Sequence, residues 1–248
     1  MHCHRDYYPP YFDKAKTKGV AKVMKLCGAS VSPYFERILI MLDMKDALDQ
    51  IDIAAVPGGF KSDEHFRYHP LGKIPFLIKD DDSSLTESQV IAEYLDHILR
   101  GPHIVPDDFE AATQARMIAR VMDLYYSAAV HPIGGAAFGG EISDAELEKA
   151  RSQDIPAAFS YLEKYMGNGK RAVGDSWSIA DAVLISQFYW YEALTPRFGL
   201  KDFSAHPKLN AYWNGVKDCD LVIRSFERVK KSYDEFAGEQ DTGSAGST

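Results

Sequence analysis

The chain has few cysteines and no long apolar run. Its three cysteines, Cys3, Cys27 and Cys219, are widely spaced among 248 residues, and an odd number at such spacing fits a reducing compartment rather than a disulfide framework. No apolar run approaches the roughly 18 residues that a membrane span needs. The start, MHCHRDYYPPYF, also lacks the apolar stretch of a signal peptide. We therefore expect a cytoplasmic protein with no membrane association.

Positive charge is scarce as well. The chain holds 28 Lys and Arg against 36 Asp and Glu, a net charge of −8. Nucleic acid is not expected as a partner, because phosphate binding requires a basic surface. The tract His2-Cys3-His4 has no partner cluster at zinc-like spacing, so no metal site is predicted. With 46% hydrophobic residues, the chain can bury a substantial core in one large or two small domains.

The first half of the chain predicts an α/β unit. A strand near 23–27 precedes Ser32-Pro33, a strong helix start with serine at the N-cap and proline at the first helical position. A strand near 49–55 follows, with a short helix near 63–68. Residues 74–98 then predict two strands joined by an acidic turn and a helix. This order, βαβ then ββα, is that of a thioredoxin-like domain.

The second half predicts helices throughout. We expect one helix from Asp107 to Val130, broken between His131 and Gly140, and another from the Ser143–Glu146 capping box to about Met166, kinked or split at Pro156. A second capping box, Ser178 with Asp181, opens a buried helix. Two helices near 206–217 and 221–236 complete an all-α domain. The predicted organisation is an N-terminal extension at 1–21, the α/β domain at 22–100, a linker at 101–106, the all-α domain at 107–236 and a disordered tail at 237–248.

Two features of the α/β half point to a ligand. Pro75 cannot donate to a sheet ladder, so we expect an edge strand that begins at Lys73-Ile74-Pro75 and leaves the backbone of Ile74 free for an extended ligand. Glu87-Ser88 stands at the strand-to-helix junction, where helix N–H groups attract a carboxylate and Glu87 attracts an ammonium. Such a pair suits the zwitterionic end of an amino acid. The alternative is a simple capping box between Ser84 and Glu87.

Gly72-Lys73-Ile74-Pro75, followed after a hairpin by Glu87-Ser88 and the helix VIAEYL, resembles the glutathione-binding half of glutathione S-transferases. The resemblance implies a thioredoxin-like domain followed by an all-α domain, with Ile74 before a cis proline, Pro75, pairing its backbone with the cysteinyl part of glutathione. It further implies that Glu87 and Ser88 hold the γ-glutamyl end and that Lys73 lies near the glycyl carboxylate. Arg37 and His69 are further basic candidates for this pocket, although Arg37 is better explained by a structural ion pair.

Ser32 is the predicted catalytic residue. The thiolate is the nucleophilic form of glutathione, and lowering a thiol pKa by about two units takes roughly 2.7 kcal/mol. One hydrogen bond to a charged acceptor contributes about 1.5–3 kcal/mol, so one hydroxyl at a helix N-terminus is sufficient. The string SPYFER resembles the active-site string of tau-class transferases, whereas omega-class relatives carry cysteine there. Two alternatives stay open. The catalytic serine is Ser30, as in zeta-class enzymes, or Ser32 is a plain N-cap.

The resemblance leads to one principal functional hypothesis and two alternatives. The first is a cytoplasmic, homodimeric detoxification enzyme in which the thiolate attacks a small hydrophobic electrophile, by conjugation or by thiolytic cleavage of an ether or halide as in bacterial and fungal etherases. The second is a glutathione-dependent cis-trans isomerase, and the third is a non-catalytic binding or scaffold protein. Candidate residues of the electrophile pocket are Tyr125, Tyr126, His131, Phe138, Trp190 and Tyr191. Cys27 is a weak candidate for a redox role.

Overall fold

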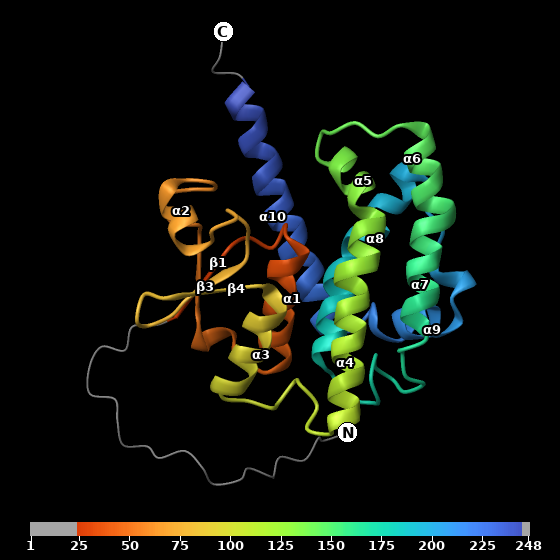
Figure 1. The fold of residues 1–248 in the computed structure, drawn as a ribbon, viewed down its shortest axis with the longest axis horizontal. Helices are drawn as coiled ribbons and strands as arrows, with labels where there is room; N and C mark the ends of the chain where they lie inside the picture. Colours follow the sequence, from red (N-terminus) through yellow and green to blue (C-terminus); the bar gives the residue numbers. More distant parts are fainter. Residues whose placement is uncertain (1–23, 245–248) are drawn as a thin grey trace.

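A computed structural model describes residues 24–244, with side chains from 24 to 237, and it comprises an α/β part and a helical part (Figure 1). The α/β part consists of β1 (Lys25–Cys27), α1 (Pro33–Met44), the 3₁₀ turn η1 (Leu48–Gln50), β2 (Asp52–Ala54), α2 (Asp63–Tyr68), β3 (Phe76–Ile78), β4 (Ser84–Thr86) and α3 (Ser88–Ile98). The helical part consists of α4 (Phe109–Val121), the π-helical turn η2 (Met122–Tyr126), α5 (Ser127–Ala137), α6 (Asp144–Lys149), the π-helical turn η3 (Ala150–Asp154), α7 (Ile155–Glu163), α8 (Ile179–Phe198), the 3₁₀ turn η4 (Phe203–Ala205), α9 (Pro207–Val216) and α10 (Asp220–Ser244). The predicted extension at 1–21, with His2-Cys3-His4, lies outside the described residues.

The sheet brings three loops to one of its ends. Its order is β2-β1-β3-β4, with β1 parallel to β2 and antiparallel to β3, and β3 antiparallel to β4. Cys27 pairs with Phe76, which in turn pairs with Thr86. The chain therefore leaves β1 toward α1, enters β3 from Ile74-Pro75, and leaves β4 into the Glu87-Ser88 junction at the same end of the sheet.

The prediction of an edge strand at Lys73 was wrong. β3 begins at Phe76 and is paired on both sides, by β1 and by β4. Pro75 stands just before the strand, where its missing N–H costs no ladder bond. The proline thus marks the entrance to a central strand and not an exposed edge.

Helix α1 lies between the sheet and the helical part. It begins at Pro33 as predicted, and all residues from Phe35 to Leu42 are buried because the helix packs against α3, α8 and α10. Two of these buried residues, Glu36 and Arg37, carry charge. Arg37 pairs with Asp123 in η2 through both guanidinium nitrogens, at 2.6 and 3.1 Å, which confirms the expected structural ion pair. The Arg37–Asp123 pair joins the two parts of the molecule across α1.

A second buried ion pair ties the segment between α3 and α4 to the core. The Lys45 ammonium and the Asp96 carboxylate lie 3.1 Å apart, with side chains only 0% and 3% exposed. Lys45 also donates to the Pro102 carbonyl at 2.8 Å, and Asp96 accepts from the backbone N–H groups of Ile104 and Val105. This short segment is therefore held rigidly where the chain passes between the two parts.

Of the two interruptions predicted for the helical part, the first differs from the structure. The helix expected to break at His131 continues through Pro132 to Ala137, because buried Ile133 and Ala136 pack against the core and outweigh the weak helix propensity. The predicted split at Pro156 is confirmed, because the π-helical turn η3 separates α6 from α7 and Pro156 lies in the first turn of α7.

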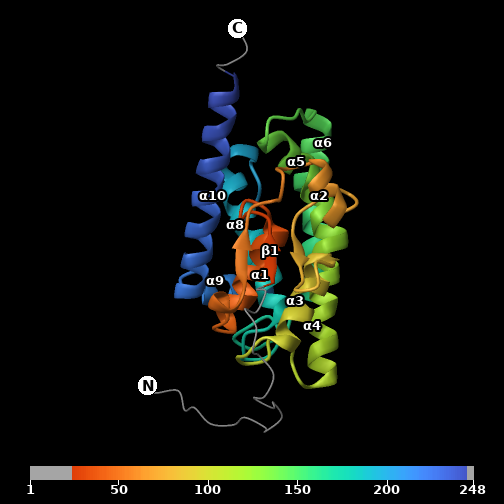
Figure 2. The same cartoon turned by 90° about the vertical axis from the view of Figure 1, so that its left-hand side faces the viewer.

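Helices α8 and α10 both pack against α1. The Ser178–Asp181 capping box forms as predicted and opens α8. Helix α10 packs against α1 and α8 and follows one side of the molecule, away from α4 (Figure 2). The tail predicted to be disordered from 237 is helical as far as Ser244, as the continuation of α10. Among the described residues, no helix is long and apolar enough to cross a membrane.

Candidate active site

Ser32 occupies the N-cap position of α1 without capping the helix. Its backbone is extended, with φ −85° and ψ 120°, and its side chain accepts no hydrogen bond from the first turn. No other described residue is a partner of its hydroxyl. The first N–H groups of α1 and its dipole favour an anion at this end. An uncommitted hydroxyl and a helix N-terminus thus meet at one point, and the plain N-cap role is not observed.

Ser30, the alternative catalytic serine, lies near a buried carboxyl. Ser30 is 9% exposed. Burial raises the pKa of Glu36, and Arg228 with the hydroxyls of Ser30 and Ser225 lowers it in part. The Arg228 Nε lies 2.9 Å from a Glu36 oxygen. Ser30 therefore lies beside the buried Glu36 carboxyl.

The backbone of Ile74 is free, as the sequence predicted. The Ile74-Pro75 peptide bond is cis, and the ladder of β3 starts only at Phe76. Neither the N–H nor the C=O of Ile74 has a hydrogen-bond partner among the described residues. This donor and acceptor can pair with an extended ligand segment.

Glu87 and Ser88 are also uncommitted. Glu87 has a left-handed backbone, with φ 70°, and its side chain makes neither a cap nor an ion pair within the described chain. Ser88 is the buried first residue of α3. The alternative capping box does not form, because Ser84 lies in β4 and its hydroxyl donates to the Tyr68 carbonyl at 2.7 Å. A carboxylate and a hydroxyl therefore stand free at the N-terminus of α3.

Only one of the three basic candidates is available to a ligand. Arg37 is occupied by Asp123. Burial, with the neighbouring His65, lowers the pKa of His69, whose Nδ1 accepts from the Leu71 N–H, so His69 is neutral near pH 7. Lys73 is exposed, and no carboxylate among the described residues pairs with it. Lys73 is thus the cation left for an anionic ligand at this end of the sheet.

An apolar cavity of about 340 Å³ opens beside Ser32. Val31 and Pro33, the two neighbours of Ser32, belong to its wall. The other lining residues come from α1, η2, α5, α8 and the loop after α8: Tyr34, Tyr126, Ser127, Val130, His131, Ile133, Gly134, Gly135, Phe138, Gln187, Trp190, Tyr191, Leu194 and Leu200. A hydrophobic molecule bound there would lie next to an anion held at Ser32.

Family models match both parts of the chain. The model for the glutathione S-transferase N-terminal domain matches residues 26–103, and that for the C-terminal domain matches residues 120–218. The chain belongs to the glutathione S-transferase family. Members of this family are enzymes that use glutathione as co-substrate, and the fold described above is the glutathione S-transferase fold.

Several transferases and isomerases are similar to this chain. A probable glutathione transferase omega-2 of Caenorhabditis elegans is 23% identical over 230 residues, covering 90% of this chain and 89% of the relative. Maleylacetoacetate isomerase of Mus musculus is 28% identical over 173 residues, covering 66% and 76%. A Methylobacillus flagellatus glutathione S-transferase solved with glutathione bound is 26% identical, with a TM-score of 0.64, and covers 82% of this chain and 98% of that one. A tau-class enzyme from mango, at 23% identity and a TM-score of 0.69 over 88% and 99%, shows the fold.

Of the residues predicted for the electrophile pocket of this glutathione S-transferase, all except Tyr125 line the cavity. Tyr125 packs edge-on against Tyr161, with ring centroids 5.2 Å apart. Cys27 is fully buried, and burial raises its pKa to about 11, so its thiol does not ionise at neutral pH. No group of three or more His, Cys, Asp or Glu within residues 24–244 is arranged to hold a metal ion.

The contribution of α10 was not predicted from the sequence. The Ser232 hydroxyl of this helix accepts a hydrogen bond from the Val31 N–H at 3.1 Å, one residue before Ser32. Tyr233 packs against Trp190 and Phe138, with centroids 5.6 and 6.0 Å apart. No local signal in the sequence joins residues about 200 positions apart. In this glutathione S-transferase, α10 fixes the loop that carries Ser32 and backs the cavity wall.

Proposed function

We propose that this protein is a glutathione transferase in which Ser32 stabilises the glutathione thiolate and the thiolate attacks a hydrophobic electrophile in the adjoining cavity. The observation that carries the proposal is the free Ser32 hydroxyl at the N-terminus of α1, beside a cavity whose wall includes both its neighbours. A donor there favours the charged form of the thiol. Ser32 cannot form a mixed disulfide, so conjugation or thiolytic cleavage is favoured over thiol exchange.

Glutathione binding in this proposal rests on groups that the protein leaves unpaired. The free Ile74 N–H and C=O pair with the cysteinyl backbone, and Glu87 and Ser88 hold the γ-glutamyl end. Lys73 supplies the positive charge for the glycyl carboxylate. Each of these groups lacks a partner among residues 24–244, which supports a role toward a ligand.

We expect Ser88→Ala to weaken glutathione binding about tenfold, because it removes one hydrogen bond to a charged group. Lys73→Ala should weaken binding only about threefold, since Lys73 is exposed and its charge is screened. Calorimetric titration with glutathione measures both effects. Ser84→Ala and Lys79→Ala are matched controls from the same hairpin, and their dissociation constants should remain within about twofold of the wild type. Equal losses in the controls would contradict the assignment.

Two other functions stay as alternatives. In cis-trans isomerisation free glutathione is regenerated, whereas conjugation consumes it, so product analysis separates the two. The cavity favours a neutral electrophile over a carboxylate substrate, because no Lys or Arg is among the described residues that line it. A non-catalytic scaffold would bind glutathione but turn over no electrophile. We also propose a homodimer, as is usual for the family, which light scattering would test.

A further inference from the structure

A second cavity, of about 440 Å³, lies where the loop between α7 and α8 meets α9. Residues 167–171 of the loop and one face of α9 line it, and it shares no residue with the cavity beside Ser32. Figure 1 shows α9 in the lower half of the helical part, away from α6. This cavity is therefore separate from the proposed transferase site.

The charged lining of this cavity is entirely positive, although the protein has a net charge of −8. Lys170 and Arg171 come from the loop, and Lys208 comes from the first turn of α9. No Asp or Glu is among the described residues that line the cavity. Charges of one sign gathered in a cleft attract and concentrate counter-ions. The lining therefore favours an anion.

The carboxylates nearby bind the backbone of this region and not its cations. An Asp175 oxygen accepts from the Lys170 N–H at 2.9 Å, and a Glu163 oxygen accepts from the Lys208 N–H at 2.7 Å. The Lys208 ammonium donates to a backbone carbonyl 2.9 Å away. None of the three cationic side chains forms an ion pair within the described residues, so their charge is left for a ligand.

Arg171 is held in place by aromatic stacking. Its guanidinium carbon lies 3.7 Å from the centre of the Trp177 ring, a cation–π contact, and one terminal nitrogen donates to the Lys170 carbonyl at 3.1 Å. Its Nε is buried and has no hydrogen-bond partner in the described chain. Because an unpaired buried donor on a charged group is costly, a ligand oxygen in the cavity is the acceptor that explains it.

The loop also offers backbone donors. The N–H groups of Asn168 and Gly169 have no acceptor among the described residues. The base of the loop is fixed by a bond of 2.9 Å from the Gly167 N–H to the Ala172 carbonyl. A Cβ on Gly169 would collide with the Gly174 carbonyl oxygen, so the path of the loop requires glycine there. Successive N–H groups in a fixed turn are a common binding site for an oxyanion.

We propose that this second cavity binds the phosphate group of a small organic phosphate monoester. Three cations and two free N–H groups match a phosphate dianion with three acceptor oxygens better than a singly charged carboxylate. Burial and Asp181 raise the pKa of Tyr212 well above its usual value, so this tyrosine stays neutral. With Pro207 and Ala211 it supplies an apolar wall for the rest of the ester. The inference does not depend on the proposed transferase function.

Calorimetric titration of the wild type in a buffer without phosphate tests the chemistry of the ligand. Phenyl phosphate should bind most tightly. Inorganic phosphate should bind about 3- to 10-fold more weakly because it lacks the apolar ring, and benzoate at least about fivefold more weakly because it carries a single charge. Absence of phenyl phosphate binding would overturn the inference, as would benzoate binding of equal strength.

Charge-matched variants locate the site. Lys170→Ala and Lys208→Ala should each weaken phenyl phosphate binding about fivefold, since each removes a contact to a charged group at a partly exposed position. Lys164→Ala and Lys217→Ala remove the same charge from exposed positions that do not line the cavity, and should change the Kd by less than about twofold. Equal losses in all four variants would overturn the inference. A loss confined to Lys73→Ala would also overturn it, by placing the anion at the proposed glutathione site.

Thermal unfolding separates loss of the site from loss of the fold. Lys170 and Lys208 are exposed, so the variant that combines both alanine substitutions should keep its ligand-free Tm within about 2 °C of the wild type. Saturating phenyl phosphate should raise the Tm of the wild type by mass action and leave that of the double variant unchanged. An equal rise in both proteins would contradict the proposed site.

Discussion

Ser32→Ala should lower kcat/KM about 10- to 50-fold at about pH 6.5 and much less above about pH 9. The hydroxyl contributes one hydrogen bond to a charged acceptor, roughly 1.5–3 kcal/mol, so its loss raises the pKa of bound glutathione by about one to two units. At the lower pH the variant then holds only a small fraction of thiolate. At the higher pH both enzymes hold mostly thiolate, and their rates converge. A pH profile of kcat/KM with a reactive electrophile measures the shift.

Ser30→Ala is the matched control for this experiment. The Ser30 hydroxyl lies near the buried carboxyl of Glu36, which Arg228 binds, and helps to lower the pKa of that carboxyl. Its loss should lower stability modestly while leaving the pH profile in place. If Ser30→Ala moved the profile and Ser32→Ala did not, the catalytic roles of the two serines would have to be exchanged.

Asp96→Ala should lower the free energy of unfolding by about 3–5 kcal/mol, the largest stability effect that we expect. The substitution leaves the Lys45 ammonium buried without its counter-charge, and removing one member of a buried pair is costly for that reason. It also takes the acceptor from the N–H groups of Ile104 and Val105. Denaturant titration at neutral pH, followed by circular dichroism, measures the loss.

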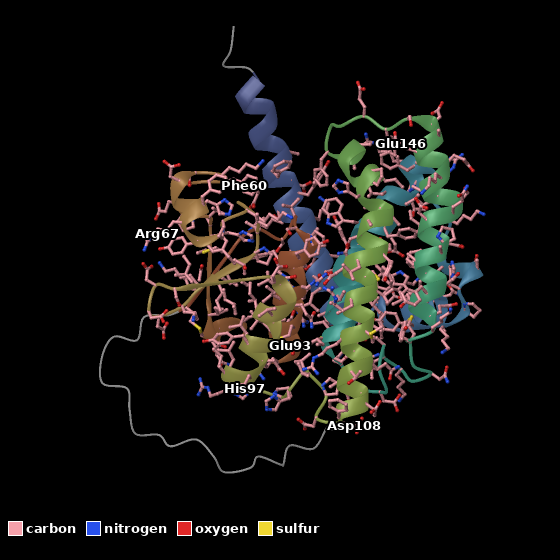
Figure 3. All side chains as sticks on the ribbon, viewed as in Figure 1. Phe60, Arg67, Glu93, His97, Asp108 and Glu146 are labelled. Atoms are coloured by element: carbon pink, nitrogen blue, oxygen red, sulfur yellow. The ribbon has the colours of Figure 1, made fainter. Side chains whose placement is uncertain are left out.

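Two variants calibrate this stability prediction. Asp96→Asn keeps one acceptor oxygen and should lose clearly less than Asp96→Ala. Glu93→Ala breaks an ion pair with Arg116, 2.8 Å long and partly exposed, on the side of α3 that faces α4 (Figure 3). Such a pair contributes about 1 kcal/mol or less. Similar losses for Glu93→Ala and Asp96→Ala would mean that the buried pair has no special role in holding the segment between α3 and α4.

Local sequence signals predicted much of the α/β part. Ser32-Pro33 begins α1, residues 63–68 form α2, and Ser88 begins α3, because these positions combine helix-start residues with periodic apolar side chains. The strand entered from Pro75 was misplaced. Its position depends on pairing with both β1 and β4, and such long-range pairing leaves no local mark in the sequence.

The helical part was harder to predict where packing overrides local preference. The sequence gives no sign that α5 passes through Pro132 or that a π-helical turn precedes α5. The site likewise contains residues that the sequence predicted and residues that it did not. The sequence alone points to Lys73, Ile74, Glu87 and Ser88. The positions of Gln187 in the cavity wall and of Ser232 beside Val31 follow only from the packing of α8 and α10 against α1. Distant partners of this kind cannot be inferred from spacing along the chain.

The most direct test of the account is the ultraviolet thiolate absorbance of bound glutathione, measured as a function of pH for wild type, Ser32→Ala and Ser30→Ala. Calorimetry at each pH confirms that the sites are saturated. We predict a thiolate band that appears about two pH units below that of free glutathione in wild type and in Ser30→Ala, and that moves back toward the free value only in Ser32→Ala. A band at the same pH in all three proteins would contradict the assignment of Ser32 as the residue that stabilises the thiolate.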